Sequence, residues 1–187
     1  TYSDVYDLSQ VVKTEFNIEG NPNKSFINMV LDVKPTQVTL VPDDDDAITS
    51  NRGWDTKNNL DFLKDIISEF KINGIRTSVF VDPLIEMVEY AKITGADRVE
   101  LFTENYALGF LKDKYNAISS YVSASKTASD LNLGLNAGHD LNFQNLKFFN
   151  QSIPGLLEVS IGHALISESL YHGLEKTIKM YIDQLNK

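Results

Sequence analysis

The sequence predicts an α/β fold in which helices cover a parallel β-sheet. Six short, largely apolar runs alternate with longer segments whose apolar residues recur three and four positions apart, the pattern of buried strands joined by amphipathic helices. Two successive runs end in the same pair, Gly138-His139 and Gly162-His163. A (β/α)8 barrel typically needs about 250 residues. Because this chain has 187, six units fit either an open doubly wound sheet or a barrel without its first two units.

Turn signals bound the elements expected in the first half of the chain. Lys34-Pro35 stops one helix and Asn73-Gly74 ends another. Four consecutive aspartates, Asp43–Asp46, predict a loop because like charges do not pack together. The expected order is helix 4–13, strand 16–19, helix 24–33, strand 37–41 and helix 60–73.

The same signals divide the second half. Asp82-Pro83 opens a helix, since proline is favoured at the first helical position. Pro154-Gly155 terminates another helix before the last strand. The expected order is strand 76–81, a helix to about Ile93, strand 98–103, helix 108–131, the run 133–139, helix 141–149, the run 157–163 and helix 166–185.

Composition argues against several classes of partner. The net charge of −9 argues against a nucleic-acid binder, which usually carries a basic face. No apolar run approaches the ~20 residues that cross a membrane, so no membrane partner is expected. The chain has no cysteine, which excludes disulfides and is compatible with a reducing cytosol. We therefore expect a cytoplasmic protein with a core of ordinary size.

Polar residues near the strand ends are the candidate catalytic groups. His139 and His163 follow successive strands, and ligands of α/β sheets and barrels bind at the carboxyl ends of strands. Glu19 ends the first strand and Glu100 lies within the fourth. Two imidazoles and two carboxylates could perform acid–base chemistry without a metal. His172, in the last helix, is expected to be structural.

Each candidate also has a plainer interpretation. Glu19 could be a surface or helix-capping carboxylate, and Glu100 could face outward and pair with a lysine. Thr49 could be a solvated turn residue, although its loop could also fold over a ligand. A metal site is a further alternative, since His and Glu are good ligands, but no HxH or HExxH spacing supports it.

Glycines next to the histidines suggest a site for a phosphate group. The amides of Gly138 and Gly162, followed by helix N-termini expected at Leu141 and Ala164, could bind phosphate despite the negative net charge. In (β/α)8 barrels the loops after the last two strands often form such a site. The alternative is that the glycines only make the turns.

Six motifs in order resemble one known family. They are Val38-Thr39-Leu40-Val41-Pro42, Ile48-Thr49, the run from Gly74 to Asp82, Val99-Glu100-Leu101-Phe102-Thr103, Asn136-Ala137-Gly138-His139 and Ile161-Gly162-His163-Ala164. Together they resemble the pyridoxine 5′-phosphate synthase family of deoxyxylulose-dependent vitamin B6 biosynthesis. The likeness covers nearly the whole chain. It implies a (β/α)8 barrel that condenses 3-amino-2-oxopropyl phosphate with 1-deoxy-D-xylulose 5-phosphate and releases phosphate and water.

The resemblance also implies roles for particular residues. Three would be catalytic: Glu19 as the carboxylate, His139 as the proton donor and Glu100 as the group that stabilises the transition state. Four would bind the phosphorylated substrates: Thr49, Asp140, Gly162 and His163. Asp140 stands where the family usually has a glycine whose backbone meets the phosphate. The resemblance implies no metal or organic cofactor, and it implies self-association into octamers.

The same resemblance implies that residues 1–187 form a single (β/α) barrel domain that is incomplete at its N-terminus. The family's first two strands, with their Asn-x-Asp-His motif, have no counterpart here. One alternative is another phosphate-binding barrel enzyme, such as an aldolase or isomerase. A Schiff-base aldolase would require a lysine on a strand, and none of the six runs has one. The other alternative is a truncated barrel without catalytic activity.

Overall fold

The computed structural model describes residues 1–43 and 49–186. Six parallel strands form one sheet, in which each strand pairs with the next strand along the chain. The predicted alternation of strands and helices is confirmed. The strands are β1 (Asn17–Gly20), β2 (Gln37–Leu40), β3 (Arg76–Val81), β4 (Arg98–Phe102), β5 (Gly134–Gly138) and β6 (Leu156–Ser160).

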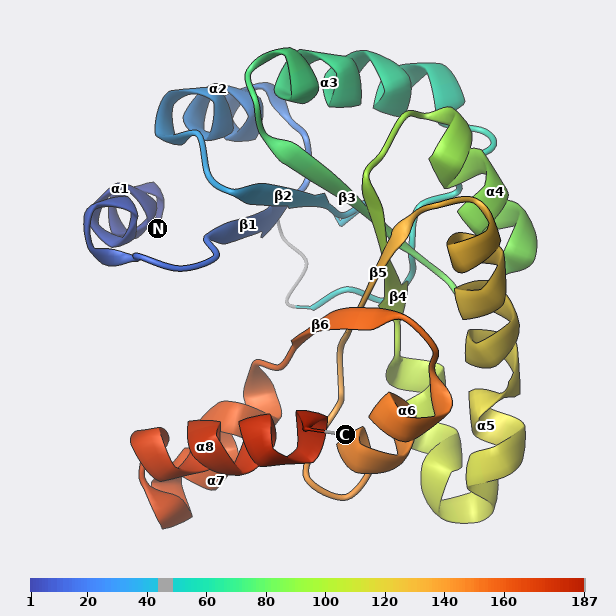
Figure 1. The fold of residues 1–187 in the computed structure, drawn as a ribbon. Coiled ribbons are helices and arrows are strands. Elements are labelled where there is room, and N and C mark those ends of the chain that lie inside the picture. The colour runs from blue at the N-terminus through green and yellow to red at the C-terminus, as the bar shows by residue number, and fades with distance from the viewer. Residues whose placement is uncertain (44–48, 187) are drawn as a thin grey trace.

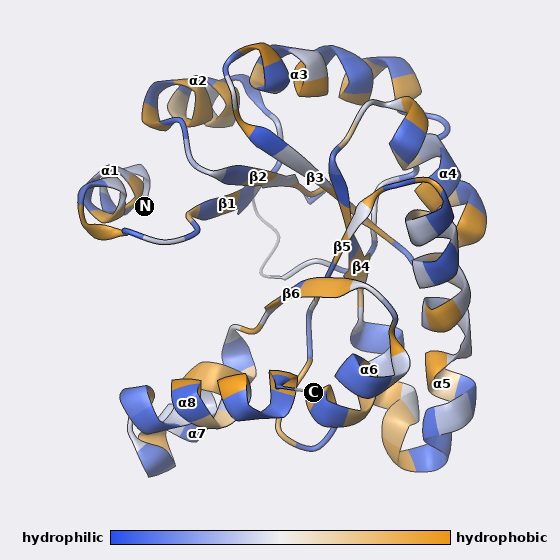
Figure 2. Ribbon diagram, viewed as in Figure 1, coloured by the Kyte–Doolittle hydropathy of each residue, from blue (hydrophilic) through white to orange (hydrophobic). Residues whose placement is uncertain are grey.

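Helices precede, connect and follow these strands. Figure 1 shows α2, α3, α4 and α5 along the outer side of the sheet, with α7 and α8 extending from β6. In Figure 2, apolar and polar residues alternate around α3 and α4, as expected for helices that cover one face of a sheet. The helices are α1 (Tyr2–Val11), α2 (Lys24–Val33), α3 (Leu60–Ile72), α4 (Ile85–Ile93), α5 (Glu104–Asp130), α6 (Leu146–Ser152), α7 (His163–His172) and α8 (Leu174–Leu185).

The sheet is curled into a half-barrel. Glu158 of β6 lies 3.3 Å from the side-chain amide of Gln37 on β2 and 3.6 Å from the guanidinium of Arg76 on β3. Other strands separate β6 from both partners in the sheet, so these side chains can meet only across a concave interior. Figure 1 shows β1 and β6 facing each other across this interior.

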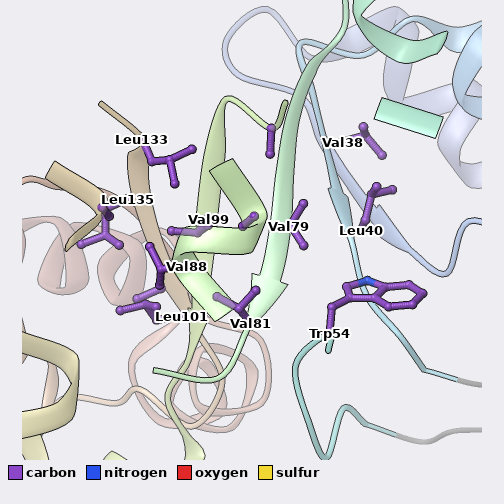
Figure 3. Packing of buried hydrophobic residues seen from close by; sticks show 14 of the residues in the cluster. Val38, Leu40, Trp54, Val79, Val81, Val88, Val99, Leu101, Leu133 and Leu135 are labelled. Carbon is purple, nitrogen blue, oxygen red and sulfur yellow. The ribbon is translucent and has the colours of Figure 1, made fainter. Parts of the chain in front are cut away.

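Apolar side chains on the convex face form the main core. Val79 and Val81 of β3, with Val99 and Leu101 of β4, pack beneath the covering helices, as Figure 3 shows beside Val88 of α4. Each side chain is almost completely buried, and burial of an aliphatic side chain contributes roughly 1.5–3 kcal/mol. The alternate residues of the same strands face inward, because successive side chains of a strand point to opposite faces.

The inward-facing residues near the start of the strands are polar and paired. Arg98 lies 2.5 Å from Glu158 and 3.1 Å from the side-chain oxygen of Asn136. The Asn136 amide donates to Glu158 at 3.0 Å. These contacts compensate for the burial of charge and occupy one end of the interior. The carboxyl ends of the strands are left for a cavity.

Two of the expected helices are wrong in their bounds. The expected helix 141–149 begins only at Leu146, because the Asn145 and Asn142 side chains accept the backbone N–H groups of Asn142 and Gln144, each at 2.9 Å. Such side-chain bonds offer the backbone an alternative to a helix. The expected helix 166–185 is two helices, separated by Gly173 at φ +80°.

The long helix α5 starts earlier than predicted and is interrupted. Asp113 has non-helical backbone angles (φ −158°, ψ 92°), and its carboxylate accepts the N–H groups of Tyr115 and Asn116. Asp113 therefore caps a second helical segment within α5. The other elements lie within a few residues of their predicted bounds.

The expected aspartate loop, Asp43–Asp46, lies outside the described residues except for Asp43. Within residues 1–43 and 49–186, no helix combines the length and apolarity needed to cross a membrane.

Candidate active site

A cavity of about 820 Å³ opens at the carboxyl ends of the strands. Its wall is formed by the ends of β1, β5 and β6, the start of α7 and part of α5. Six of the seven site residues predicted from the sequence line it, namely Glu19, Thr49, His139, Asp140, Gly162 and His163. The structure therefore brings the predicted residues together, while their individual roles stay predictions.

Glu100, the seventh predicted residue, lies beneath the cavity. Its side chain is fully buried, with the Thr39 hydroxyl 3.4 Å from one carboxylate oxygen, while the other oxygen has no hydrogen-bond partner among the described residues. The alternative of an outward-facing Glu100 paired with a lysine is wrong. A Cβ at Gly138 would overlap the other Glu100 oxygen, so this glycine also makes room for the carboxylate.

Burial and neighbouring negative charges make Glu100 and Glu19 weak acids. Burial raises the pKa of Glu100 well above its usual range, and the negative charge of Glu19 raises it further. The pKa of Glu19 is also raised, first by burial and then by the charge of Asp43. Loss of hydration penalises a charged carboxylate, and a second carboxylate nearby penalises it again. Near neutral pH the two side chains can therefore hold protons.

His139 faces Glu19 from the opposite side of the interior. Its Nε2 lies 4.0 Å from Glu19 Oε1. The ring packs against Phe80 and Phe102, with centroids 5.0 and 5.3 Å away. Burial lowers the pKa of His139, an effect opposed mainly by the charge of Asp140. The lowered pKa follows from the aromatic surroundings, which stabilise an imidazolium less well than water does.

Burial raises the pKa of Glu19 to about 7 and lowers the pKa of His139, so each group is less readily charged here than in water. The separation of 4.0 Å is too long for a hydrogen bond, so the two groups do not bond each other directly and both line the cavity. Acid–base catalysis is most effective when pKa values lie near the working pH.

The start of α7 provides donors for an anion. Gly162 is the N-cap of α7, which begins at His163, one residue before the predicted start at Ala164. The first N–H groups of a helix have no partner within the helix, and the cavity is lined by Gly162, His163 and Ala164. The other helix N-terminus predicted from the sequence, at Leu141, is wrong because α6 begins only at Leu146.

Thr49 belongs to the loop that joins β2 to α3, and this loop is attached to the end of β3. The backbone N–H of Trp54 donates to the Phe80 carbonyl at 2.8 Å, and Gly53 packs directly against the backbone of Val81 and Asp82. A side chain at Gly53 would overlap that backbone. The loop therefore reaches the cavity from a fixed point at the end of the sheet.

Sequence reasoning missed several residues that shape the site. Ser160 and Phe80 can be found only from the strand register, which places Phe80 beside Glu100 and Ser160 beside Gly138. Thr103 holds the backbone at His139, a contact across two loops that no local pattern indicates. Ala107 and Leu108 line the cavity from α5, at the place where that helix was expected only to begin.

Comparisons with known proteins agree on one family. Residues 1–187 match the model of the family described as "Pyridoxal phosphate biosynthesis protein PdxJ". The pyridoxine 5′-phosphate synthase of Flavobacterium johnsoniae is 58% identical over 184 residues, covering 98% of this chain and 78% of the relative. The enzyme of the same name from Bacteroides fragilis is 61% identical over 179 residues, covering 96% of this chain and 76% of the relative.

Solved structures of more distant proteins share the fold. A structure titled "Native KDPGal structure" matches with a TM-score of 0.62 at 11% identity, covering 100% of this chain and 76% of that one. The YdjI aldolase of Escherichia coli K12 matches with a TM-score of 0.60 at 11% identity, covering 98% and 72%. At such identities the likeness concerns the fold alone.

Proposed function

This chain belongs to the PdxJ family of pyridoxine 5′-phosphate synthases, and from that membership we propose that its cavity condenses 3-amino-2-oxopropyl phosphate with 1-deoxy-D-xylulose 5-phosphate. The products are pyridoxine 5′-phosphate, phosphate and water. The observation that carries this proposal is the convergence of Glu19, His139 and His163 on one cavity above a buried Glu100.

The catalytic groups are assigned by position and pKa. Ring closure requires protons to be removed from carbon and nitrogen and delivered to departing oxygen atoms. His139 Nε2 and Glu19 Oε1 lie 4.0 Å apart at the cavity, and burial shifts the pKa of both groups. In our assignment Glu19 accepts protons and His139 donates them. Glu100 is a neutral carboxyl at neutral pH and stabilises developing negative charge by donating a hydrogen bond.

Substrate phosphates are assigned to the rim of the cavity. The amides at Gly162 and His163 point from the start of α7, where the helix dipole favours an anion. Thr49 offers a hydroxyl from the loop after β2 for the second substrate. Asp140 contributes its backbone, and its carboxylate must turn away from the phosphate.

Larger features of the family are also proposed for this protein. We assign the curled sheet to a (β/α)8 barrel, in keeping with its parallel strands in sequential order and its aldolase-like fold neighbours. The two further βα units expected from the resemblance, the single-domain organisation, the octamer and the cytoplasmic location all stay predictions. The runner-up functions are not favoured, since the relatives from Flavobacterium johnsoniae and Bacteroides fragilis share one enzyme name.

The direct test is an assay of the purified protein with both substrates. We expect pyridoxine 5′-phosphate, identified by mass, to form together with an equal amount of inorganic phosphate. Neither product should form when one substrate is omitted. A folded protein that binds both substrates but yields neither product would support the alternative of a barrel without catalytic activity.

Replacing Asp140 with glycine should tighten substrate binding. Asp140 is exposed at the cavity, lies next to the proposed phosphate site and has a left-handed backbone at φ +57°. Glycine removes a charge that repels phosphate and adopts this conformation without strain. We expect KM for a phosphorylated substrate to fall about 2–5-fold, measured by steady-state kinetics.

Asp140→Asn separates the effect of charge from that of the backbone. Asparagine removes the charge and is one of the few residues that tolerate the left-handed region, so it should reproduce most of the decrease in KM. An unchanged or higher KM in both variants would show that the Asp140 carboxylate does not face the bound phosphate.

A further inference from the structure

The backbone at His139 has a conformation that its residue types disfavour. His139 and Asp140 are consecutive residues with left-handed angles, at φ +81° and +57°. Residues with a Cβ rarely adopt this region. Such a conformation persists only where surrounding contacts hold it, and it is often found at functional sites. Contacts from neighbouring residues must therefore hold this turn.

The first contact comes from Thr103, directly after β4. Its side chain is completely buried. Its hydroxyl lies 2.6 Å from the Gly138 carbonyl oxygen and also contacts the His139 carbonyl oxygen. Its backbone N–H donates to the same Gly138 oxygen at 2.9 Å. One residue, directly after β4, thus binds two successive carbonyl groups, one on either side of the His139 nitrogen.

The second contact comes from Asn145, directly before α6. Its side-chain amide donates to the Asp140 carbonyl at 3.1 Å, while its side-chain oxygen accepts the N–H of Asn142 at 2.9 Å. Asn145 is itself buried, and its own carbonyl accepts the Tyr106 hydroxyl at 2.7 Å. Three successive carbonyl groups, from Gly138 to Asp140, are therefore held by buried side chains.

Helix capping does not account for the Thr103 side chain. Thr103 stands at the N-cap of α5, where a threonine commonly accepts a hydrogen bond from the first turn. Here its side chain makes no such bond. The hydroxyl is directed instead toward the neighbouring strand. The preceding residue, Phe102, packs on the His139 ring at 5.3 Å, and its carbonyl is held by Tyr121 at 2.9 Å.

We propose that Thr103 is a positioning residue that holds the His139 turn in its left-handed conformation and so directs the imidazole toward Glu19. The proposal rests on the assignment of His139 as a proton-transfer group. The end of β4 thereby fixes both the backbone of His139, through Thr103, and one face of its ring, through Phe102. Loss of the hydroxyl should let the turn relax and move Nε2 away from its position 4.0 Å from Glu19.

The experiment compares Thr103→Val with a matched control, Thr94→Val. Thr94 is also buried, and its hydroxyl also donates to a backbone carbonyl, that of Ala91 at 2.6 Å, but at the end of α4. We expect Thr103→Val to lower kcat about 10–100-fold, as expected when a catalytic group is misplaced. KM should change less than about 3-fold, because Thr103 does not line the cavity. Thr94→Val should retain kcat.

Two further measurements separate positioning from a loss of stability. Thr103→Ser keeps the hydroxyl, so its kcat should lie within about 3-fold of the wild-type value. If Thr103→Val does not fold, Thr103→Ala takes its place and should show the same loss of kcat. In the His139→Asn background, Thr103→Val should cause no additional loss of kcat, since residues that act through one another are not additive. An additional loss of kcat as large as the loss that Thr103→Val causes in the wild-type background would overturn the proposal.

The outcomes distinguish this inference from the proposed function. Should His139→Asn retain full turnover, the assignment of His139 fails and the positioning role fails with it. Should His139→Asn be inactive while Thr103→Val matches Thr94→Val in kcat, only the positioning role is wrong. NMR titration of His139 gives a readout independent of turnover: we expect its pKa to rise in Thr103→Val as the ring leaves its buried position between Phe80 and Phe102.

Discussion

His139→Asn is expected to lower kcat by a factor on the order of 10²–10⁴, the range typical for removal of a general acid or base. Asparagine keeps a polar side chain and tolerates the left-handed backbone at this position, so the fold should survive. It cannot carry a proton between substrate and Glu19, 4.0 Å from His139 Nε2. The measurement is steady-state kinetics with both substrates, on protein whose folding has been checked by circular dichroism.

His172→Asn is the control for this experiment. His172 is exposed at the end of α7, and its ring lies 6.5 Å from that of Phe143. It does not line the active-site cavity. We expect its replacement to change kcat less than about 2-fold, since exposed substitutions away from a site have small effects. Equal losses in the two variants would remove His139 from its assigned role.

Glu100→Gln is expected to abolish most activity and yet stabilise the protein at alkaline pH. Burial raises the pKa of Glu100 in the folded protein to about 8, above its ordinary value of 4.5. The stability that the neutral carboxyl contributes is therefore complete below pH 4.5 and is lost as pH rises through the folded-state pKa. Glutamine occupies the same space without ionising, so it avoids that loss.

The expected gain in unfolding free energy is on the order of 5 kcal/mol at pH 9 and close to zero at pH 4.5. Denaturant titrations of both proteins across this pH range would measure it. Glu69→Gln, on the exposed side of α3, should change stability by no more than about 0.5 kcal/mol. A difference between Glu100→Gln and wild type that does not vary with pH would contradict the raised pKa of Glu100.

Activity and stability should thus change in opposite directions at this position. Glutamine cannot supply the acidic proton of the carboxyl group, so kcat is expected to fall on the order of 10²-fold or more. Functional sites commonly retain groups that cost stability. An active, more stable Glu100→Gln variant would mean that the carboxyl is a packing residue rather than part of the catalytic set.

Much of the site could be predicted because its residues lie at the ends of strands. The runs that end in Gly138-His139 and Gly162-His163 are local patterns, and parallel strands place their carboxyl ends at one edge of a sheet. This pattern predicted that Glu19, His139 and His163 converge, and all three line one cavity. The order of the six strands along the chain followed from the same local patterns.

Errors in the sequence prediction arose where side chains compete for the backbone. The helix expected at Leu141 does not form there, because Asn142 and Asn145 bind the N–H groups that a helix would leave free. The last expected helix is divided at Gly173, whose left-handed angles interrupt the helical path. Helical periodicity alone continues through both places and does not reveal the break.

By itself, the sequence determined the order of strands and helices, the family resemblance and the candidates for catalysis, because these depend on residues close together along the chain. Only the tertiary structure decided that Glu100 faces inward, that burial raises the pKa of Glu19 and lowers that of His139, and that Thr103 binds the turn at His139. These properties arise where the curled sheet brings together groups from distant segments. Their distances and their exclusion from water depend on that curvature rather than on any local pattern.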